Sequence, residues 1–226
     1  MFTISKNTKV IGSSLILLFL FIACSSKDLT GLESKTLKVS KTVQSKSTDS
    51  LQHAYFASGC FWCVEAIFQS VKGVEDAISG YSGGEANTAN YNDVSSGRTK
   101  HAESVEVIYD STVISYNTLL TVFFDSHDPS TLNQQGPDRG TQYRSEIFFS
   151  NKNEQALAQT FIDSLKSNNI YTKVTTRLTP LKAFYPAEDY HQEYEKNHPN
   201  NSYVRSVSIP RLNKFKKKHP ELLKEE

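Results

Sequence analysis

Short strand-like and helix-like patterns alternate along this chain of 226 residues, and this alternation is the strongest constraint on its fold. Residues 54–57 form an apolar run that a Ser-Gly pair ends, which predicts a buried strand. Apolar residues at 61, 64, 67, 68 and 71 then keep helical spacing up to a Lys-Gly stop. Because strands and helices interleave within one compact segment, we expect an α+β fold.

The same periodicities predict the remaining elements. Strands are expected at residues 74–81, 103–109, 145–150 and 174–178, helices at residues 116–127 and 152–167, and a Gly- and Asn-rich loop through Asn92. We therefore predict a two-layer α/β sandwich of the ferredoxin-like kind, with a mixed or antiparallel sheet and a long irregular C-terminal segment. A parallel α/β fold is the alternative.

The first 23 residues have the pattern of a secretory signal peptide. Lys6 and Lys9 precede an apolar run over residues 10–23, which is too short to cross a bilayer because a spanning helix takes about 20 residues. The run ends in Phe-Ile-Ala-Cys and thus resembles a bacterial lipoprotein signal, in which the cysteine, here Cys24, becomes lipidated. We predict an exported lipoprotein, anchored to a membrane and facing the periplasm or the cell surface. A soluble secreted or periplasmic protein is the alternative.

Composition divides the rest of the chain into three parts. Residues 24–52 are rich in Ser, Thr and Lys and cannot bury enough apolar surface to fold. We predict that they form a flexible tether with a root-mean-square span on the order of 30 Å. Residues 53–208 are expected to form the one globular domain, and residues 209–226 a tail that packs on this domain or extends from it.

Charge and cysteine content exclude several classes of protein. The 25 Lys and Arg residues nearly balance the 24 Asp and Glu residues, so we expect no nucleic-acid partner. Three cysteines are too few for a disulfide framework or a four-thiolate zinc site, and we expect neither a metal nor another bound cofactor. Two of the three, Cys60 and Cys63, form a C-x-x-C pair.

Cys60 lies at the predicted junction between a strand and a helix. Unpaired backbone N–H groups and the helix dipole favour a thiolate at such a position, so we expect a lowered pKa for Cys60. Cys63 would lie on the same helix face, with about 5 to 6 Å between Cβ atoms, which is close enough for a disulfide. The motif alone leaves three interpretations open: a redox pair, a structural disulfide and half of a zinc site.

Five longer motifs accompany this pair. In chain order they are ASGCFWCVEAIF, GYSGG, YNDVSSGRTKHAESVEV, HDPSTLNQQGPDRGTQYRSEIFFS and FYPAEDYHQEY. Together they resemble the A-type peptide methionine sulfoxide reductases, in the same order and without large gaps, from about residue 54 to the C-terminus. The resemblance implies thiol-dependent reduction of methionine S-sulfoxide, free or in proteins.

The resemblance also implies a division of roles. Cys60 would attack the sulfoxide sulfur, and Glu103 would donate a proton, which a carboxyl group can do near neutral pH only if burial raises its pKa. Tyr91 and Tyr143 would form hydrogen bonds to the sulfoxide oxygen, and Phe61 and Trp62 would form an aromatic wall for the methyl group. Asp138 would belong to the surrounding polar network.

Cys63 is expected to resolve the sulfenic acid that the reaction leaves on Cys60. In the commonest form of the family, glycine follows the tryptophan and the resolving cysteine lies elsewhere, whereas this sequence resembles a minority subtype with cysteine at that position. A thioredoxin-like protein would then reduce the Cys60–Cys63 disulfide. We expect the protein to be a monomer.

The C-x-x-C pair leaves a second class of function open. A membrane-tethered disulfide oxidoreductase or redox-sensing adaptor would use the same two thiols without sulfoxide chemistry. Such a protein would keep its function in Glu103→Gln, whereas a sulfoxide reductase would lose a proton donor. A non-catalytic interaction lipoprotein is a third class, and it predicts that Cys60→Ser has no effect.

Overall fold

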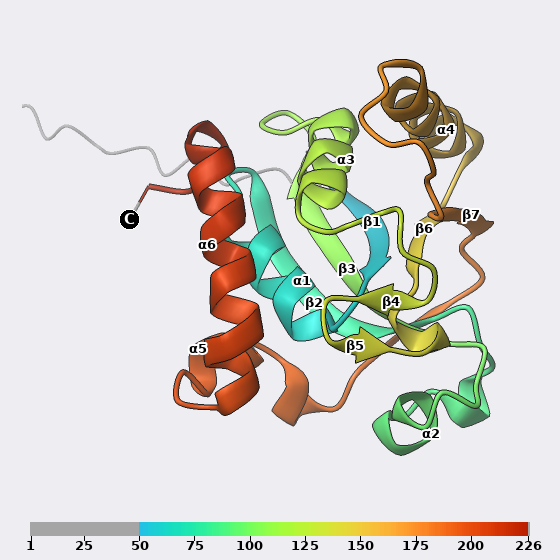
Figure 1. Ribbon diagram of the computed structural model, residues 1–226, viewed down its shortest axis with the longest axis vertical. Helices are drawn as coiled ribbons and strands as arrows, with labels where there is room; N and C mark the ends of the chain where they lie inside the picture. Colours follow the sequence, from blue (N-terminus) through green and yellow to red (C-terminus); the bar gives the residue numbers. More distant parts are fainter. Residues whose placement is uncertain (1–49, 226) are drawn as a thin grey trace, which may run out of the picture. The chain divides into compact units, whose positions relative to one another are not determined.

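The computed structural model describes residues 50–225, which contain a six-stranded sheet with helices packed against it (Figure 1). The predicted signal peptide, Cys24 and the tether up to residue 49 lie outside the described residues. Within residues 50–225, no helix is long and apolar enough to span a membrane.

The central sheet has the strand order β7-β6-β1-β3-β2-β8. Its strands are β1 (Leu51–Ser58), β2 (Val74–Ser82), β3 (Ala102–Asp110), β6 (Ser145–Phe149), β7 (Arg177–Pro180) and β8 (Phe184–Pro186). All neighbouring strands are antiparallel except β6 and β7, which run parallel, so the sheet is mixed. A separate hairpin is formed by β4 (Gln134–Gln135) and β5 (Asp138–Arg139).

Part of this sheet has the predicted ferredoxin-like topology. The chain runs through β1, α1 (Phe61–Gln69), β2, β3, α3 (Tyr116–Asp125) and β6, and the four strands lie in the order β6-β1-β3-β2. Each helix connects two strands that run in the same direction and leaves room for an antiparallel strand between them. The predicted α+β sandwich is confirmed.

Within residues 50–225, five further helical segments and four short 3₁₀ turns surround this unit. The α-helices are α2 (Tyr91–Ser95), α4 (Lys152–Ser167), α5 (Tyr194–Asn197) and α6 (Ile209–Lys218); the π-helical segment is η5 (Val204–Ser208); the 3₁₀ turns are η2 (Ala86–Thr88), η3 (Thr141–Tyr143), η4 (Asp189–His191) and η6 (Pro220–Leu222). In Figure 1, α6 runs beside α1, and α4 lies beyond α3 at the β7 edge of the sheet. The helices α1 and α3 of the ferredoxin-like unit are thus each flanked by a further helix.

The C-terminal segment is more regular than the sequence analysis predicted. Residues 204–218 are helical, and their inward face buries Val204, Ser208 and Phe215. The backbone N–H of Lys72, just after α1, donates to the carbonyl of Leu222 at 2.8 Å. The expected irregular segment is found between β8 and residue 201, where only the turn η4 and the four-residue α5 occur, whereas residues 204–218 depart from it because the many lysines masked this apolar spacing.

Two other local predictions were wrong in detail. The loop expected through Asn92 contains α2, which begins where the Asn90 side chain accepts a hydrogen bond from the Asp93 N–H. The strand predicted at residues 174–178 is β7 at Arg177–Pro180, which begins three residues later because pairing with β6 sets its position, and the short strand β8 after it was not predicted. Helix α4, by contrast, has the predicted bounds, and an Asn151 cap fixes its start.

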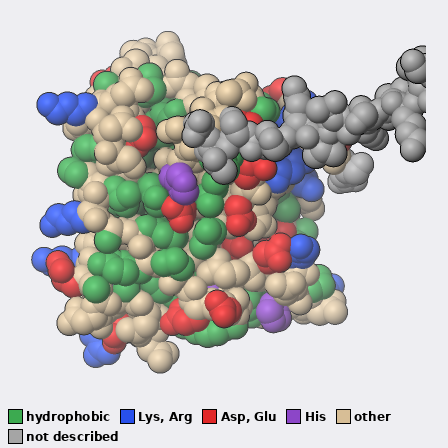
Figure 2. All heavy atoms as spheres, turned by 180° about the vertical axis from the view of Figure 1, so that it is seen from behind, with side chains coloured by type: hydrophobic (Ala, Val, Ile, Leu, Met, Phe, Trp, Pro, Cys, Tyr) green, Lys and Arg blue, Asp and Glu red, His purple; other side chains and the backbone are tan. Residues whose placement is uncertain are grey.

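Figure 2 shows one face of the domain, seen from behind the view of Figure 1. Hydrophobic and acidic side chains are interspersed over its middle, and most Lys and Arg side chains lie towards its edges. Among the described residues on this face there is no continuous basic stripe of the kind that follows a nucleic-acid backbone.

The hydrophobic core lies between the sheet and the two helices of the ferredoxin-like unit. The Phe56 ring on β1 stacks on Phe68 of α1 and on Phe123 of α3, with ring centroids 5.2 Å apart in both pairs. All three rings are fully buried. This aromatic cluster joins α1, whose first residues form the candidate site, to the centre of the sheet.

We predict that Phe56→Ala lowers the free energy of unfolding by about 3 to 5 kcal/mol, because it removes buried ring contacts to both helices and leaves a cavity. Urea denaturation followed by circular dichroism measures the loss. Val113→Ala is the control, since this side chain is 53% exposed and its truncation should change stability by less than about 0.5 kcal/mol. A loss below about 1 kcal/mol for Phe56→Ala would contradict the prediction.

Candidate active site

Cys60 occupies the N-cap position of α1, directly after β1. Helices α2, α3 and α4 each begin with a side chain that accepts a backbone hydrogen bond, whereas α1 has no side-chain cap. Gly59 has a φ of 90°, and a Cβ at this residue would lie 2.6 Å from the Gln135 Cβ. This glycine turn therefore places Cys60 at the start of the helix, and the thiol accepts no capping hydrogen bond from the helix backbone.

A cavity of about 300 Å³ opens at Cys60. Its walls are formed by Cys60, Phe61, Trp62, Tyr91, Glu103, Asp138, Tyr143, Asn201, Ser202 and Tyr203. The structure thus brings together every residue predicted for catalysis or substrate binding except Cys63, although these residues come from α1, α2, β3, β5 and η3. Among residues 50–225, no group of three or more His, Cys, Asp or Glu side chains could hold a metal ion.

Glu103 on β3 lies at the bottom of this cavity. Its carboxyl oxygen Oε2 accepts a hydrogen bond from the Phe61 backbone N–H at 3.0 Å, and the side chain is only 2% exposed. Burial raises the pKa of Glu103 to about 8, and the nearby charge of Asp138 adds to the effect. At neutral pH the carboxyl group is therefore protonated, as a proton donor must be.

Trp62 forms a fixed aromatic wall at the cavity. Its ring stacks on Tyr194 with a centroid separation of 3.7 Å and an interplanar angle of 7°. Its indole N–H donates to Nδ1 of His191 at 3.1 Å, which assigns the proton of this histidine to Nε2. Phe61 lies with its ring centroid 5.1 Å from that of His191, so both predicted wall residues share one support.

Tyr91 and Tyr143 face the cavity from α2 and η3. Neither phenol hydroxyl forms a hydrogen bond to another described residue. Burial, together with the charges of Glu103 and Cys60, raises the pKa of each phenol, so both stay protonated. Two hydroxyl groups are thus free to donate hydrogen bonds to a ligand oxygen.

Tyr203 is a cavity residue that sequence reasoning missed, together with its neighbours Asn201 and Ser202. Its hydroxyl donates to Oδ2 of Asp138 at 2.6 Å and lies 3.9 Å from Sγ of Cys63. The segment that carries it has no periodic pattern and follows the last motif, so no signal in the sequence placed it at the site.

The two thiols differ from the sequence-based expectation. Burial, a hydrogen bond to Cys63 and the charge of Glu103 raise the pKa of Cys60 well above its ordinary value. A hydrogen bond from Cys60, and then the charge of Arg211, lowers the pKa of Cys63 to about 6. The predicted lowering at Cys60 was wrong because burial outweighs the field of the helix start, and because the N–H groups of Phe61 and Cys63 donate to Glu103 and to the Cys60 carbonyl. These two N–H groups therefore do not stabilise a thiolate at Cys60.

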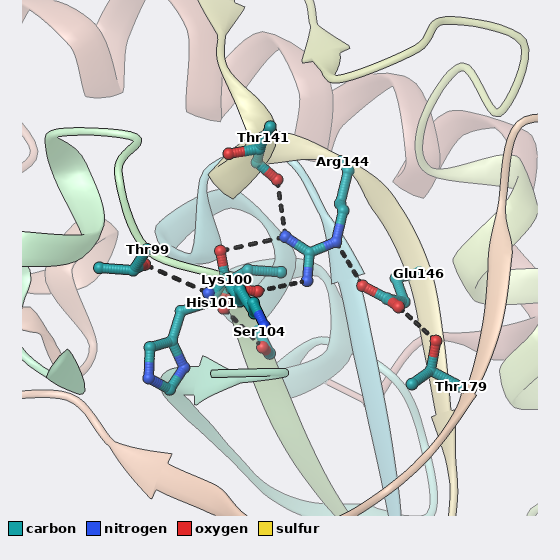
Figure 3. Close-up of polar contacts among 9 residues, drawn as sticks. Thr99, Lys100, His101, Ser104, Thr141, Arg144, Glu146 and Thr179 are labelled. Atoms are coloured by element: carbon teal, nitrogen blue, oxygen red, sulfur yellow. Dashed lines mark hydrogen bonds and ion pairs between the residues drawn. The ribbon is translucent and has the colours of Figure 1, made fainter. Parts of the chain in front are cut away.

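Arg144 links the backbone that precedes Glu103 to the turn that carries Tyr143 (Figure 3). Its guanidinium donates to the backbone carbonyls of Lys100 (2.9 Å), His101 (3.0 Å) and Thr141 (2.8 Å), and forms a buried ion pair with Glu146. Tyr143 immediately precedes Arg144, and Glu103 lies two residues after one of the carbonyls that Arg144 binds. The clamp therefore fixes the backbone from which both side chains project.

An uncapped thiol, a buried neutral carboxyl group and free phenols around one cavity define a thiol-dependent oxidoreductase. Residues 52–223 match the family model described as "Peptide methionine sulfoxide reductase". The chain therefore belongs to the peptide methionine sulfoxide reductase family.

Individual relatives agree with this assignment. The chain is 48% identical over 173 residues to the "Peptide methionine sulfoxide reductase MsrA" of Pasteurella multocida, an alignment that covers 76% of this chain and 99% of that protein. It is 45% identical to "Peptide methionine sulfoxide reductase MsrA 2" of Synechocystis, with coverages of 76% and 82%.

Solved structures show the same fold. The reduced form of Mxr1 from Saccharomyces cerevisiae superposes with a TM-score of 0.63 at 32% identity, covering 68% of this chain and 89% of that chain. Methionine sulfoxide reductase A of Corynebacterium diphtheriae gives a TM-score of 0.61 at 30% identity, with coverages of 69% and 78%.

The raised pKa of Glu103 predicts a pH-dependent stability. Because the folded pKa is about 8 and the unfolded value 4.5, this group stabilises the fold fully below pH 4.5, and its contribution is lost as pH rises through 8. We expect the unfolding free energy of the wild type, relative to Glu103→Gln, to fall by roughly 1.4 kcal/mol per pH unit between pH 5 and 8. Urea titrations at several pH values measure this difference, and a pH-independent difference would show that the carboxyl group is ionised at neutral pH.

Proposed function

We propose that this protein reduces methionine S-sulfoxide, free or in proteins, by attack of Cys60 on the sulfoxide sulfur. The single observation that carries the proposal is the convergence of one thiol, one neutral carboxyl group and two unpaired phenol hydroxyls on a cavity with an aromatic wall. We assign the S epimer because the resemblance to the A-type reductases implies it, and the chain belongs to the peptide methionine sulfoxide reductase family.

The first step needs a nucleophile at sulfur and an acid at oxygen. Cys60 transfers its proton towards Cys63, with which it already shares a hydrogen bond, and its sulfur attacks that of the substrate. Glu103 protonates the sulfoxide oxygen, which Tyr91 and Tyr143 hold by hydrogen bonds. The oxygen then passes from the substrate sulfur to Cys60 as the bond between the two sulfurs breaks, which releases methionine and leaves Cys60 as a sulfenic acid.

The second step makes use of Cys63. Its pKa of about 6 allows Cys63 to give up the proton that it received from Cys60 and to react as a thiolate at neutral pH. This thiolate attacks the sulfenic sulfur of Cys60 and forms the Cys60–Cys63 disulfide, and the hydroxyl group leaves as water with the proton that Cys63 gave up. Cysteine within the GCFWC motif supports assignment of the chain to the subtype that carries its resolving thiol on the catalytic helix.

The oxidised enzyme then needs electrons from outside the chain. We assign this role to a thioredoxin-like dithiol protein, because thiol exchange reduces a disulfide without a bound cofactor. The protein would work as a monomer, since one chain supplies every side chain of the cavity.

Export and anchoring are proposed from the N-terminal sequence. The apolar run that ends at Cys24 supports a cleaved signal peptide (1–23) and a lipidated cysteine. The polar segment 24–52 would hold a catalytic domain (53–208) and its packed tail (209–226) clear of the membrane. The protein would then repair oxidised methionine in the periplasm or at the cell surface. Tritiated palmitate labelling of wild type but not of Cys24→Ala tests the anchor.

Removal of the resolving thiol tests the assigned thiol roles. We predict that Cys63→Ser releases one equivalent of methionine from a sulfoxide peptide and then stops, because Cys60 remains as a sulfenic acid. Mass spectrometry with dimedone trapping locates the oxidised sulfur. Cys60→Ser is the matched control and should release none. Sustained turnover by Cys63→Ser with thioredoxin would contradict the role of Cys63.

The acid role of Glu103 predicts a particular pH profile. Wild-type kcat/KM should fall as pH rises through about 8, because the donor loses its proton there. Glu103→Gln should lower kcat/KM by about 10²-fold or more and lack this decline. Insulin reduction by the same variants separates the two function classes, since a disulfide oxidoreductase would retain that activity in Glu103→Gln. An unchanged profile in the variant would exclude Glu103 as the acid.

A further inference from the structure

The two sulfurs of the C-x-x-C pair differ in how they can be approached from outside. Cys60 forms part of the cavity wall, whereas Cys63 is absent from that wall and is only 1% exposed. The hydroxyl oxygen of Tyr203 lies 3.9 Å from Sγ of Cys63, and Tyr203 also lines the cavity. Substrate and solvent therefore reach Cys60 but not Cys63.

The C-terminal segment closes the other side of Cys63. Ser208 at the end of η5 interacts with the Cys63 thiol, and the positive charge of Arg211 on α6 acts on it. Arg211 is itself anchored, because its Nε donates to the Ser126 carbonyl at 2.7 Å and its Nη2 to the Ser58 hydroxyl at 3.3 Å. The side chains around Cys63 on this side are thus polar, and hydrogen bonds to Ser126 and Ser58 fix the position of Arg211.

The C-terminal segment is fastened to the helix that it covers. Phe215 of α6 is buried in the core, and α6 runs beside α1 in Figure 1. Beyond α6, Val71 pairs with Leu223 in an antiparallel bridge, and the Lys224 N–H donates to the Ser70 carbonyl at 3.0 Å. Exposure of Cys63 would require these contacts to open together.

We propose that the thiolate of the external dithiol protein attacks Cys60, through the substrate cavity, and that Cys63 is the leaving group, held by Tyr203, Ser208 and Arg211. This inference rests on the proposed function, since it concerns the disulfide that the proposed cycle forms. It assigns to the C-terminal segment, which lacks cysteine, the task of receiving the leaving thiolate.

The exchange balances as two successive displacements. The reductant's first thiolate forms a bond to Sγ of Cys60, the Cys60–Cys63 bond breaks, and its electron pair leaves on Sγ of Cys63. The reductant's second thiol then attacks its own first sulfur, which releases the Cys60 thiol and leaves the reductant oxidised. A leaving thiol of low pKa departs faster, and the surroundings of Cys63 lower its pKa to about 6.

The assignment has a kinetic consequence. Methionine sulfoxide and the reductant use the same opening, so the methionine product has to leave the cavity before the disulfide can be reduced. A reductant that attacked Cys63 from another side would not compete with the product.

Trapping of the mixed disulfide tests the site of attack. The full-length protein, oxidised by one turnover of a sulfoxide peptide, is mixed with excess thioredoxin whose second active-site cysteine is replaced by serine. Acid quenching, alkylation and fragment mass spectrometry of the peptide that contains both cysteines locate the adduct. We expect thioredoxin on Cys60 and the alkyl group on Cys63. The reverse distribution would overturn the inference.

Protection by product is a second, independent measurement. Saturating N-acetyl-methioninamide should slow reduction of the oxidised protein by thioredoxin severalfold, whereas N-acetyl-alaninamide at the same concentration should not. A reduction rate that is the same with both compounds would show that attack does not pass through the cavity.

Arg211 is a positioning residue in this scheme, and its charge provides the third readout. Arg211→Met should move the midpoint of thiolate absorbance at 240 nm to higher pH and slow disulfide reduction, and Arg211→Lys should restore part of both. Arg205→Met is the matched control, because Arg205 lies exposed on η5. An unchanged midpoint in Arg211→Met would exclude Arg211 from holding the thiolate.

These outcomes separate this inference from the proposed function. If wild-type protein releases no methionine from a sulfoxide peptide, or forms no Cys60–Cys63 disulfide, the proposed cycle itself is wrong. If both occur and thioredoxin is found on Cys63, only the direction of attack is wrong.

Discussion

The hydrogen bond from the Phe61 N–H to the Glu103 carboxyl group ties the start of α1 to the middle of the sheet. It satisfies one of the unpaired N–H groups at the helix start and, at the same time, gives a buried carboxyl group its partner. Because Cys60 immediately precedes this N–H, the bond places the thiol and the acid on one cavity. Arg144 in turn holds the strand of Glu103 next to the turn that carries Tyr143, because it donates to the carbonyls of both His101 and Thr141.

Burial around this bond distributes protons within the site. It raises the pKa of both Glu103 and Cys60, since a charge on either would be poorly solvated. The negative charge is accommodated on Cys63 instead, where Tyr203, Ser208 and Arg211 surround the sulfur. In the proposed cycle each group therefore starts in the form that its first role requires: Glu103 as an acid with its proton, and Cys63 as a thiolate that can accept the proton of Cys60.

Local signals in the sequence carried the prediction of the fold. Helix α4 has its predicted bounds because an Asn151 cap and a regular apolar stripe specify them locally. The strand β7 was misplaced because its position depends on pairing with β6, about 30 residues earlier in the chain, rather than on its own composition. The regular α6 was missed because a Lys-rich sequence hid the spacing of Val204 and Phe215.

The candidate site shows the same division between local and long-range effects. Motifs of the family identified seven residues that the structure places on one cavity, although spacing alone could not have joined Tyr91 to Asp138. The pKa prediction for Cys60 was wrong, since it used only the local field of the helix and ignored burial. Tyr203 could not be predicted at all, because it lies 140 residues after Cys63 and only the folded tail brings the two together.

The placement of the resolving thiol on α1 explains how a firmly attached C-terminal segment is compatible with the proposed cycle. Cys63 lies one turn from Cys60, so their sulfurs can meet through rotation within the first turn of the helix, and no distant segment has to move. The N–H groups of Cys63 and Val64 donate to the Cys60 carbonyl at 3.2 and 3.4 Å, which are long and therefore weak hydrogen bonds. Distortion of this turn costs little, and the segment from η5 to η6 can stay packed against α1 while the disulfide forms and is reduced.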